Sequence, residues 1–253
     1  DGLGEHCPIH YEALSPFYEM NDHNTGISGL GGNPAYPKYS PELPPIPMGK
    51  LGQTLAEGFN KIGWHWWPSD VAILSQDHNG RQKCVNAGTC DLGCAAGAKG
   101  GTNFTYWPML RSTGVELRTE CRVREIIVDE KTGLATGAIY HGSDGQVYEQ
   151  KAEMVIVACN GVGTPRLLLN SKSKSFPNGL ANRSGLVGKN LMFHPLTGIA
   201  GVFSEPMLGH EGPMACSILS QEFYETDTSR NFVRGYGLYS GRSTTPMTYA
   251  LGG

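Results

Sequence analysis

A glycine-rich turn that follows an apolar run is the pattern in this sequence most suggestive of a ligand site. The run Met154-Val-Ile-Val-Ala-Cys159 leads into Asn160-Gly-Val-Gly-Thr-Pro165 and then into an apolar stretch that ends near Ser171. This order predicts a strand, a turn and a helix. Because a helix N-terminus offers unpaired N–H groups and a partial positive charge, such a turn suits a phosphate group. A plain strand–helix connection is the alternative.

Four residues of this turn have distinct expected roles. Gly161 and Gly163 let the backbone approach a ligand closely. Thr164 is placed to cap the helix through its hydroxyl. Pro165 suits the first helical turn, where its missing N–H costs nothing. We therefore expect the helix to begin next to Thr164.

Three cysteines, Cys84, Cys90 and Cys94, lie in one glycine-rich loop with the spacing Cys-x5-Cys-x3-Cys. Three thiolates so placed could hold an iron–sulfur cluster. A local disulfide or free thiols are the alternatives, and the odd total of seven cysteines argues against a complete disulfide framework. Cys121 and Cys159 lie in or beside apolar patterns, so we expect both to be buried as small hydrophobic residues.

The histidines offer one candidate for general-base chemistry. His194, in Asn190-Leu-Met-Phe-His-Pro195, could act as a base, but a buried, hydrogen-bonded histidine at a domain crossover is the favoured interpretation. His10, His65 and His210 have no partners at a telling spacing.

Composition excludes several classes of protein. The net charge is −3, which gives no electrostatic attraction to nucleic acid. No apolar run is long enough to span a bilayer. The chain has 35 Gly and 16 Pro among 253 residues, with charged residues at 17%. That excess of Gly and Pro predicts many tight turns, while the aromatic residues argue against disorder.

The helices and strands that position these residues are predicted from hydrophobic periodicity and from the Gly, Pro and other turn residues between them. Helices are predicted over 8–22, 49–62 and about 102–112, with an extended Gly/Pro-rich loop over 24–48. Thr102 or Asn103 is the expected N-cap of the third helix. Strands are predicted at the ranges 115–117, 123–129, 135–141, 146–152 and 153–159, with weaker ones at 198–203 and 232–239.

The short turns between the strands from 123 to 152 favour an antiparallel β-meander. The continuous apolar run at 153–159 favours a strand buried on both faces of a parallel sheet. The sequence therefore predicts a mixed α/β (α+β) fold.

Several segments together resemble the glucose-methanol-choline (GMC) family of FAD-dependent oxidoreductases. The stretch Ala158–Ser171 is similar to the family's second signature region, and Gly179–Pro195 is similar to the segment that follows it. Upstream, Cys90–Lys99 with Thr105-Tyr106 also fits, as do Asp1-Gly-Leu-Gly and Pro8-Ile-His-Tyr11. The resemblance covers most of residues 1–227 and is nearest to bacterial sugar or gluconate dehydrogenase flavoprotein subunits.

The resemblance implies which residues meet the cofactor FAD. Val123 matches the valine whose backbone contacts the adenine. The turn would lie against the cofactor through Cys159, Asn160, Gly161, Gly163, Thr164 and Pro165. The domains implied are an excursion near the substrate side (1–80), part of a Rossmann-like FAD-binding domain with its β-meander (81–196), and the start of a substrate-binding domain with an antiparallel sheet (197–253).

The family's N-terminal Gly-x-Gly-x-x-Gly fingerprint and its C-terminal catalytic histidine with a His or Asn partner have no match here. We therefore expect this sequence to be an internal piece of a flavoprotein that neither binds FAD tightly nor turns over alone, with its catalytic histidine outside the piece.

The resemblance implies hydride transfer to flavin from the CH–OH group of an alcohol, sugar or polyol, in a dehydrogenase. The alternatives are a long-chain alcohol or sterol oxidase of the same family, an iron–sulfur electron-transfer module, and a bare interaction domain. The partners expected are the small-molecule substrate and an electron-acceptor subunit or cytochrome. The bacterial periplasm or cytoplasm is the expected compartment.

Overall fold

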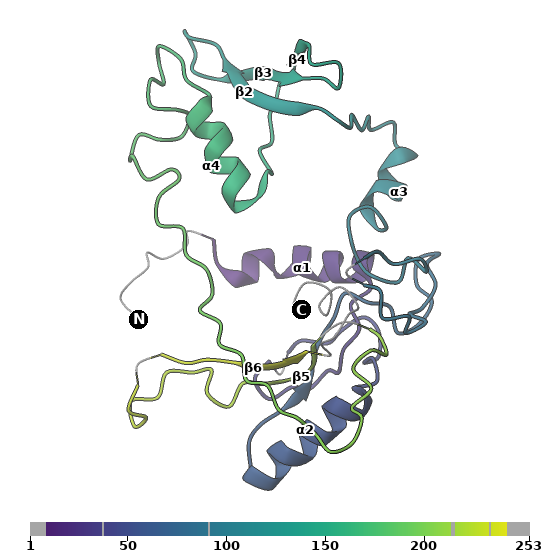
Figure 1. The fold of residues 1–253 in the computed structure, drawn as a ribbon. Coiled ribbons are helices and arrows are strands. Elements are labelled where there is room, and N and C mark those ends of the chain that lie inside the picture. The colour runs from purple at the N-terminus through teal and green to yellow at the C-terminus, as the bar shows by residue number, and fades with distance from the viewer. Residues whose placement is uncertain (1–8, 37, 91, 214–215, 233, 242–253) are drawn as a thin grey trace. The chain divides into compact units, whose positions relative to one another are not determined.

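The computed structural model describes residues 9–36, 38–90, 92–213, 216–232 and 234–241 (Figure 1). It divides into two compact units, one formed by residues 1–115 with 201–253 and the other by residues 116–200. We call the second the meander unit and the first the split unit. This division follows compactness, and the three functional domains inferred from the sequence stay a prediction.

An antiparallel three-stranded sheet forms the frame of the meander unit. Its strands β2 (Arg122–Val128), β3 (Ala135–His141) and β4 (Val147–Lys151) are hydrogen-bonded in the order β2-β3-β4. The turn before β3 is fixed by Asp129, whose Oδ1 accepts the N–H groups of Lys131 and Thr132 at 2.9 and 2.7 Å. Gly133 then takes a left-handed φ of +71°. The predicted meander is confirmed, with strand ends within about one residue of those expected.

Helix α4 (Asn160–Asn170) packs against β2 in the same unit (Figure 1). Leu167 of the helix and Ile126 of the strand are both buried. The hydroxyl of Ser171, which is only 2% exposed, donates to the carbonyl oxygen of Leu167 at 2.7 Å and accepts the N–H of Ile126 at 2.9 Å. One side chain thus joins the end of the helix to the strand.

The apolar run at 153–159 does not form the predicted strand. Its described residues are in no sheet, and the exposed fractions are 78% for Met154 and 82% for Ile156. A strand buried on both faces needs neighbouring strands and covering helices, and the described residues of the meander unit supply neither to this run. The ranges 115–117 and 198–203 are also not strands. The mixed α/β class is confirmed, with antiparallel sheets.

The split unit is built from three helices and a second antiparallel sheet. The helices are α1 (Tyr11–Thr25), α2 (Gly49–Ile62) and α3 (Tyr106–Arg111). The strands β1 (Trp67–Pro68), β5 (Cys216–Ser220) and β6 (Leu238–Gly241) have the order β1-β5-β6. Helix α2 has the predicted bounds, α1 begins and ends three residues later than predicted, and α3 is shorter than predicted.

Close packing of α2 on β5 explains part of this arrangement. Ala56 of the helix is buried, and Ile218 of the strand is fully buried. A Cβ atom on Gly52 would lie 3.1 Å from Oγ of Ser217, so glycine allows the helix to approach the strand. Strands β1 and β5 were not predicted from the sequence, because β1 has only two residues and β5 reads as a mixed polar segment.

Loops supply the rest of the core of the split unit. Leu43, Leu74 and Ala98 are buried together, with the half-buried Cys84 and Cys94 packed against them. The fully buried Ser28 hydroxyl donates to the carbonyl of Ile73 at 2.7 Å. Because buried polar groups must be hydrogen-bonded, such contacts let irregular backbone pass through a core.

Helix α1 buries none of its residues, although it is 15 residues long. Its interior Pro16 removes one helical hydrogen bond. The C-cap Gly26 has the left-handed φ of +76° and donates its N–H to the carbonyl of Asp22 at 2.8 Å. Contacts at this end therefore hold the helix, rather than an apolar face along its length.

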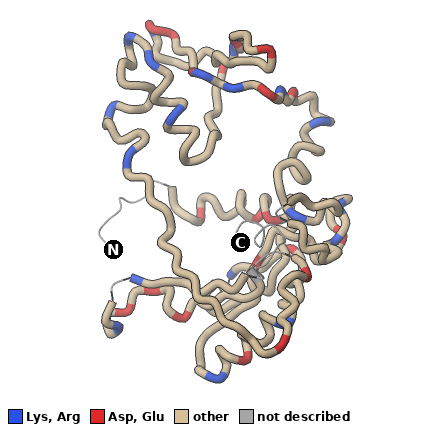
Figure 2. Tube along the Cα trace, in the orientation of Figure 1, with Lys and Arg blue, Asp and Glu red and all other residues tan. Residues whose placement is uncertain are grey.

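Charges of both signs are interspersed along the described chain (Figure 2). The five ion pairs recorded among the described residues include exposed ones such as Lys50 Nζ–Glu205 Oε2 at 2.8 Å. Exposed pairs contribute little to stability. Among the described helices, none combines the length and the apolar character needed to cross a bilayer.

The Ser171 contact gives a direct prediction for stability. Ser171→Ala leaves the buried N–H of Ile126 without an acceptor, which should lower the free energy of unfolding by about 1–3 kcal/mol. Ser184→Ala, at an exposed hydroxyl of the same unit, should change it by less than about 0.5 kcal/mol. Urea unfolding of the two variants and the parent protein measures both. Equal stability of the two variants would contradict the proposed link.

Candidate functional site

A groove of about 530 Å³ lies beside helix α4 within the meander unit. One wall is the helix, and the other is an extended segment over residues 188–192. The lining residues are Gly161, Val162, Pro165, Arg166, Leu169, Asn170, Gly188, Lys189, Asn190, Leu191 and Met192. Its volume lies within the usual range for small-molecule sites.

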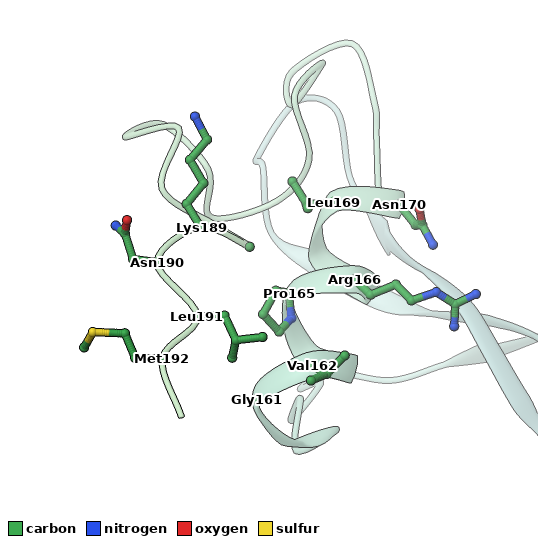
Figure 3. Close-up of a pocket in the computed structure, with 11 residues that line it drawn as sticks. Gly161, Val162, Pro165, Arg166, Leu169, Asn170, Lys189, Asn190, Leu191 and Met192 are labelled. Carbon is green, nitrogen blue, oxygen red and sulfur yellow. The ribbon is translucent and has the colours of Figure 1, made fainter. Parts of the chain in front are cut away.

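The groove is apolar inside with basic groups at its edges (Figure 3). Leu191 points from the extended segment toward Pro165 on the helix. The charged ends of Arg166 and Lys189 point outward from the gap. No Asp or Glu is among its described lining residues. Such a groove suits a ligand that combines an apolar ring with a negative charge.

Asn160 organises the first turn of α4, which differs from the prediction for Thr164. The Asn160 side-chain oxygen Oδ1 accepts the N–H groups of Val162 and Gly163 at 2.9 and 3.0 Å. Its φ of +63° is left-handed, a conformation that asparagine tolerates better than most residues. Asn160 therefore performs the capping predicted for Thr164, four residues earlier in the chain.

Thr164 and Pro165 consequently lie inside the helix rather than at its start. The Thr164 hydroxyl oxygen Oγ1 accepts the N–H of Cys159 at 3.1 Å, so it satisfies a donor that precedes the helix. Pro165 cannot donate the helical hydrogen bond to the carbonyl of Gly161. The predicted helix start was wrong because a left-handed asparagine allowed the helix to begin directly after the apolar run.

The three glycines of the site are required for different reasons. A Cβ atom on Gly161 would meet nothing within 4 Å, and this residue faces the groove. A Cβ atom on Gly163 would lie 3.1 Å from Cβ of Cys159, so this glycine accommodates the chain itself. Gly188 has a φ of +77°, and its Cβ would lie 3.0 Å from Leu169 Cδ1. Only Gly161 leaves room for a ligand to approach the backbone.

Available N–H groups are fewer than the sequence suggested. The first turn of a helix leaves four N–H groups without a helical acceptor. The Asn160 side chain takes two of them. Within the described part of the chain, the amides of Asn160 and Gly161 are those left for an anion.

Of the predicted cofactor residues, Gly161 and Pro165 line the groove, while Asn160, Gly163 and Thr164 shape the turn behind it. Val123 lies in β2 opposite Tyr140, is 44% exposed, and is not a lining residue. Whether these residues meet a cofactor stays a prediction. Arg166, Lys189 and Leu191 were missed, although they fall in segments that the sequence analysis singled out.

Cys159, His194 and the cysteine loop lie in other surroundings. Cys159 is exposed, because the run that precedes it is unpaired, so its predicted burial was wrong. Cys121 is half-buried. His194 is also exposed, which excludes the buried role that was favoured for it in this structure.

The three loop cysteines, Cys84, Cys90 and Cys94, are each half-buried. The Sγ atom of Cys94 accepts the N–H of Lys99 at 3.5 Å. Lys99 Nζ donates to the carbonyl of Cys90 at 2.7 Å. The three Sγ atoms do not all lie within 4.8 Å of one another, since the metal-ligand groupings of the described residues include no cysteine.

A groove along a helix whose first turn has open backbone suits a nucleotide-like ligand, and whether it binds one stays a prediction. Comparison with known proteins makes the class specific. The model of a family described as GMC oxidoreductase matches residues 46–196, and the chain therefore belongs to the GMC oxidoreductase family.

Relatives of known name agree with this membership. The chain is 43% identical to a 2-methyl-1,2-propanediol dehydrogenase of Mycolicibacterium austroafricanum, over 97% of the chain and 45% of that protein. It is 28% identical to a fructose dehydrogenase large subunit of Gluconobacter japonicus, over 87% of the chain and 41% of the relative. A long-chain-alcohol oxidase of Arabidopsis thaliana is 26% identical, over 68% of the chain and 23% of that relative. The chain spans less than half the length of these relatives.

The family implies FAD, and the groove residues fit part of such a group. Gly161 leaves its backbone open, two amides of the first turn are available, and Arg166 and Lys189 supply positive charge. The apolar lining by Val162 and Leu191 suits a flat ring next to a phosphate. These residues would hold a phosphate with its adjoining ring, while the remainder of a dinucleotide needs other contacts.

The capping contacts predict how the turn responds to mutation. Asn160→Ala should lower the free energy of unfolding by about 1–3 kcal/mol, because two N–H groups lose their acceptor and alanine must adopt a left-handed φ. Asn160→Gly keeps the backbone freedom and should cost less than about 1 kcal/mol. Urea unfolding measures both. An alanine variant as stable as the parent would contradict the capping role.

Proposed function

We propose that this chain is part of an FAD-dependent dehydrogenase that oxidises the CH–OH group of an alcohol, sugar or polyol. One observation carries the proposal: a member of the GMC oxidoreductase family has an open groove at the start of α4, where Gly161 leaves the backbone accessible. A bound flavin supplies the hydride acceptor, and the protein positions it.

The residues of the meander unit bind and orient rather than react. Asn160 fixes the first turn, so the free amides of the turn keep one direction. Arg166 and Lys189 point outward in the structure and would turn toward the groove to contact a negatively charged group there. Leu191 and Val162 give the groove an apolar inner surface on which a flat ring could pack. No residue of this site is assigned to proton transfer, and we expect the general base to be a histidine outside the sequence given.

Support for the substrate class comes from the relatives. The relative at 43% identity is named for a small branched diol, and another is named for fructose. We therefore favour a small alcohol or polyol. The Arabidopsis relative is named a long-chain-alcohol oxidase, which supports the same-family oxidase as the alternative. Oxygen uptake, compared with reduction of a dye acceptor, distinguishes an oxidase from a dehydrogenase.

Gly161 provides a test that separates cofactor binding from folding. Gly161→Ala should fold normally, because its Cβ meets nothing within 4 Å and alanine favours a helix. It should nevertheless lower the flavin content of the complete protein at least about tenfold, because the methyl group occupies space that the cofactor uses. Visible flavin absorbance per mole of protein measures this.

Gly58→Ala is the matched control. Gly58 is also a helical glycine whose Cβ would meet nothing within 4 Å, but it lies in α2. This variant should keep the flavin content of the parent. Full flavin content in Gly161→Ala would show that the cofactor does not approach this backbone, and the proposal would then fail at this site.

The iron–sulfur cluster is a separate proposal that rests on three cysteines in one loop. Lys99 joins this loop through contacts to Cys90 and Cys94. The Sγ atoms would have to move together to share a cluster. If the cluster forms, iron and acid-labile sulfide should be found in stoichiometric amounts in the complete protein, and Cys94→Ser should remove them. Absence of iron from protein purified without oxygen would contradict it.

We further propose an electron-accepting subunit or cytochrome as partner and the bacterial periplasm or cytoplasm as compartment. One relative is named as a large subunit, which supports an assembly of more than one chain. Co-purification with the native host's proteins and fractionation of its cells test these two points.

A further inference from the structure

We propose that His23, Glu42 and His78 form a binding site for a divalent metal ion of the zinc type at the C-terminal end of α1. Their ligand atoms all lie within 4.8 Å of one another. Among the described residues, no other group of three or more His, Cys, Asp or Glu side chains gathers in this way. All three belong to the split unit, so the site does not depend on the groove beside α4.

The side chains already contact one another directly. Nδ1 of His23 lies 3.0 Å from Oε1 of Glu42. The His23 and His78 rings meet edge to face, with their centroids 5.4 Å apart. Nε2 of His78 also lies 2.6 Å from the backbone carbonyl oxygen of His23. The three groups thus gather around one point at the surface of the split unit.

Backbone contacts fix the three segments that carry these groups. The loop with Glu42 is held where Leu43 donates to the carbonyl of Ile27 at 2.9 Å. His78 is held by its paired backbone hydrogen bonds with Arg81, at 3.0 and 2.9 Å. Because binding is stronger when ligands are already ordered, such restraint favours a metal site.

Glycine at the end of α1 allows the approach of His78. A Cβ atom on Gly26 would lie 3.0 Å from Cδ2 of His78 and 2.3 Å from Cδ2 of Leu74. The left-handed φ of Gly26 also ends the helix. A larger residue here would push the second imidazole away from the first.

The C-terminus of α1 attracts a metal cation to this site, and the positive charge of Arg81 repels it. A helix C-terminus has a partial negative charge, which favours a cation near His23 in the last turn. The guanidinium of Arg81 is the opposing group, but it is held by the carbonyl oxygens of Thr25 and Gly97. A metal with strong imidazole bonds can overcome this repulsion, whereas a weakly bound ion cannot.

Ligand chemistry selects the type of metal. Two imidazole nitrogens and one carboxylate oxygen suit Zn²⁺ and similar first-row ions, whereas Mg²⁺ and Ca²⁺ prefer oxygen ligands. Tetrahedral zinc places its ligand atoms about 3.4 Å apart. The His23–Glu42 pair, at 3.0 Å, is already near that separation. The other two separations, which are at most 4.8 Å, would shorten by no more than about 1.4 Å, and water would complete the coordination.

His78 can bind through either ring nitrogen. Binding through Nδ1 would retain the hydrogen bond from Nε2 to the His23 carbonyl, which is the outer support common for metal-binding histidines. Binding through Nε2 would replace both that hydrogen bond and the 3.0 Å contact of Nε2 with the Asn79 side-chain amide. In both cases the ion would join the end of α1 to the loops at 42 and 78.

Zinc titration of the complete protein tests the site. After treatment with EDTA and dialysis, titration calorimetry with ZnCl₂ should show one ion bound per chain at this site. His23→Gln and His78→Gln should each weaken that binding at least about tenfold. His10→Gln is the matched control, because His10 flanks the other end of α1 and its side chain does not cap the helix. It should bind zinc as the parent does.

Thermal unfolding and cobalt spectra distinguish the loss of a metal ligand from misfolding of a variant. Zinc should raise the melting temperature of the parent and of His10→Gln more than that of His78→Gln. A second measurement does not depend on the folding of a variant. Co²⁺ added to the metal-free parent protein should give the intense visible bands of four-coordinate cobalt. Equal zinc affinity of His78→Gln and the parent, or a spectrum of merely hydrated Co²⁺, would overturn the proposal. Flavin content is measured independently and is expected to be unaffected.

Discussion

The hydroxyl of Ser171 is the contact on which the meander unit depends. It joins the last turn of α4 to the backbone of β2 and is almost completely buried. Because the helix is rigid, fixing its C-terminal end on the sheet also fixes the direction of its first turn. The groove beside α4 therefore has its geometry set at the opposite end of the same helix.

At the first turn, capping and ligand binding compete for the same donors. Asn160 takes two of the N–H groups that a phosphate could otherwise use. The site compensates with basic side chains at the rim and an open backbone at Gly161. Affinity for an anion would then come from charge and shape together, and less from the helix terminus alone than in a glycine loop without a capping side chain.

Several large apolar residues on either side of α4 and the groove are exposed to solvent. Met154 and Ile156 precede α4, and Leu196 and Ile199 follow the groove, yet all four are exposed. Leaving apolar surface in water rather than burying it costs about 25 cal/mol of free energy for each Å². Their pattern is that of buried strands, so burial would require neighbours beyond those the described residues provide.

The sequence by itself determined several of the local elements and the family. Periodicity and turn residues predicted α2 and the β2-β3-β4 meander, because helical spacing and Gly-containing turns act within a few residues. The glycine-rich turn marked the site. Tertiary structure decided the rest: the start of α4 at the left-handed Asn160, the exposure of 153–159, and the meeting of His23, Glu42 and His78. The exposure of 153–159 and the meeting of His23, Glu42 and His78 depend on which distant segments lie nearby, which local spacing does not encode. The contacts that start α4 are local, but they require the left-handed φ of Asn160, which the glycine-rich pattern did not reveal.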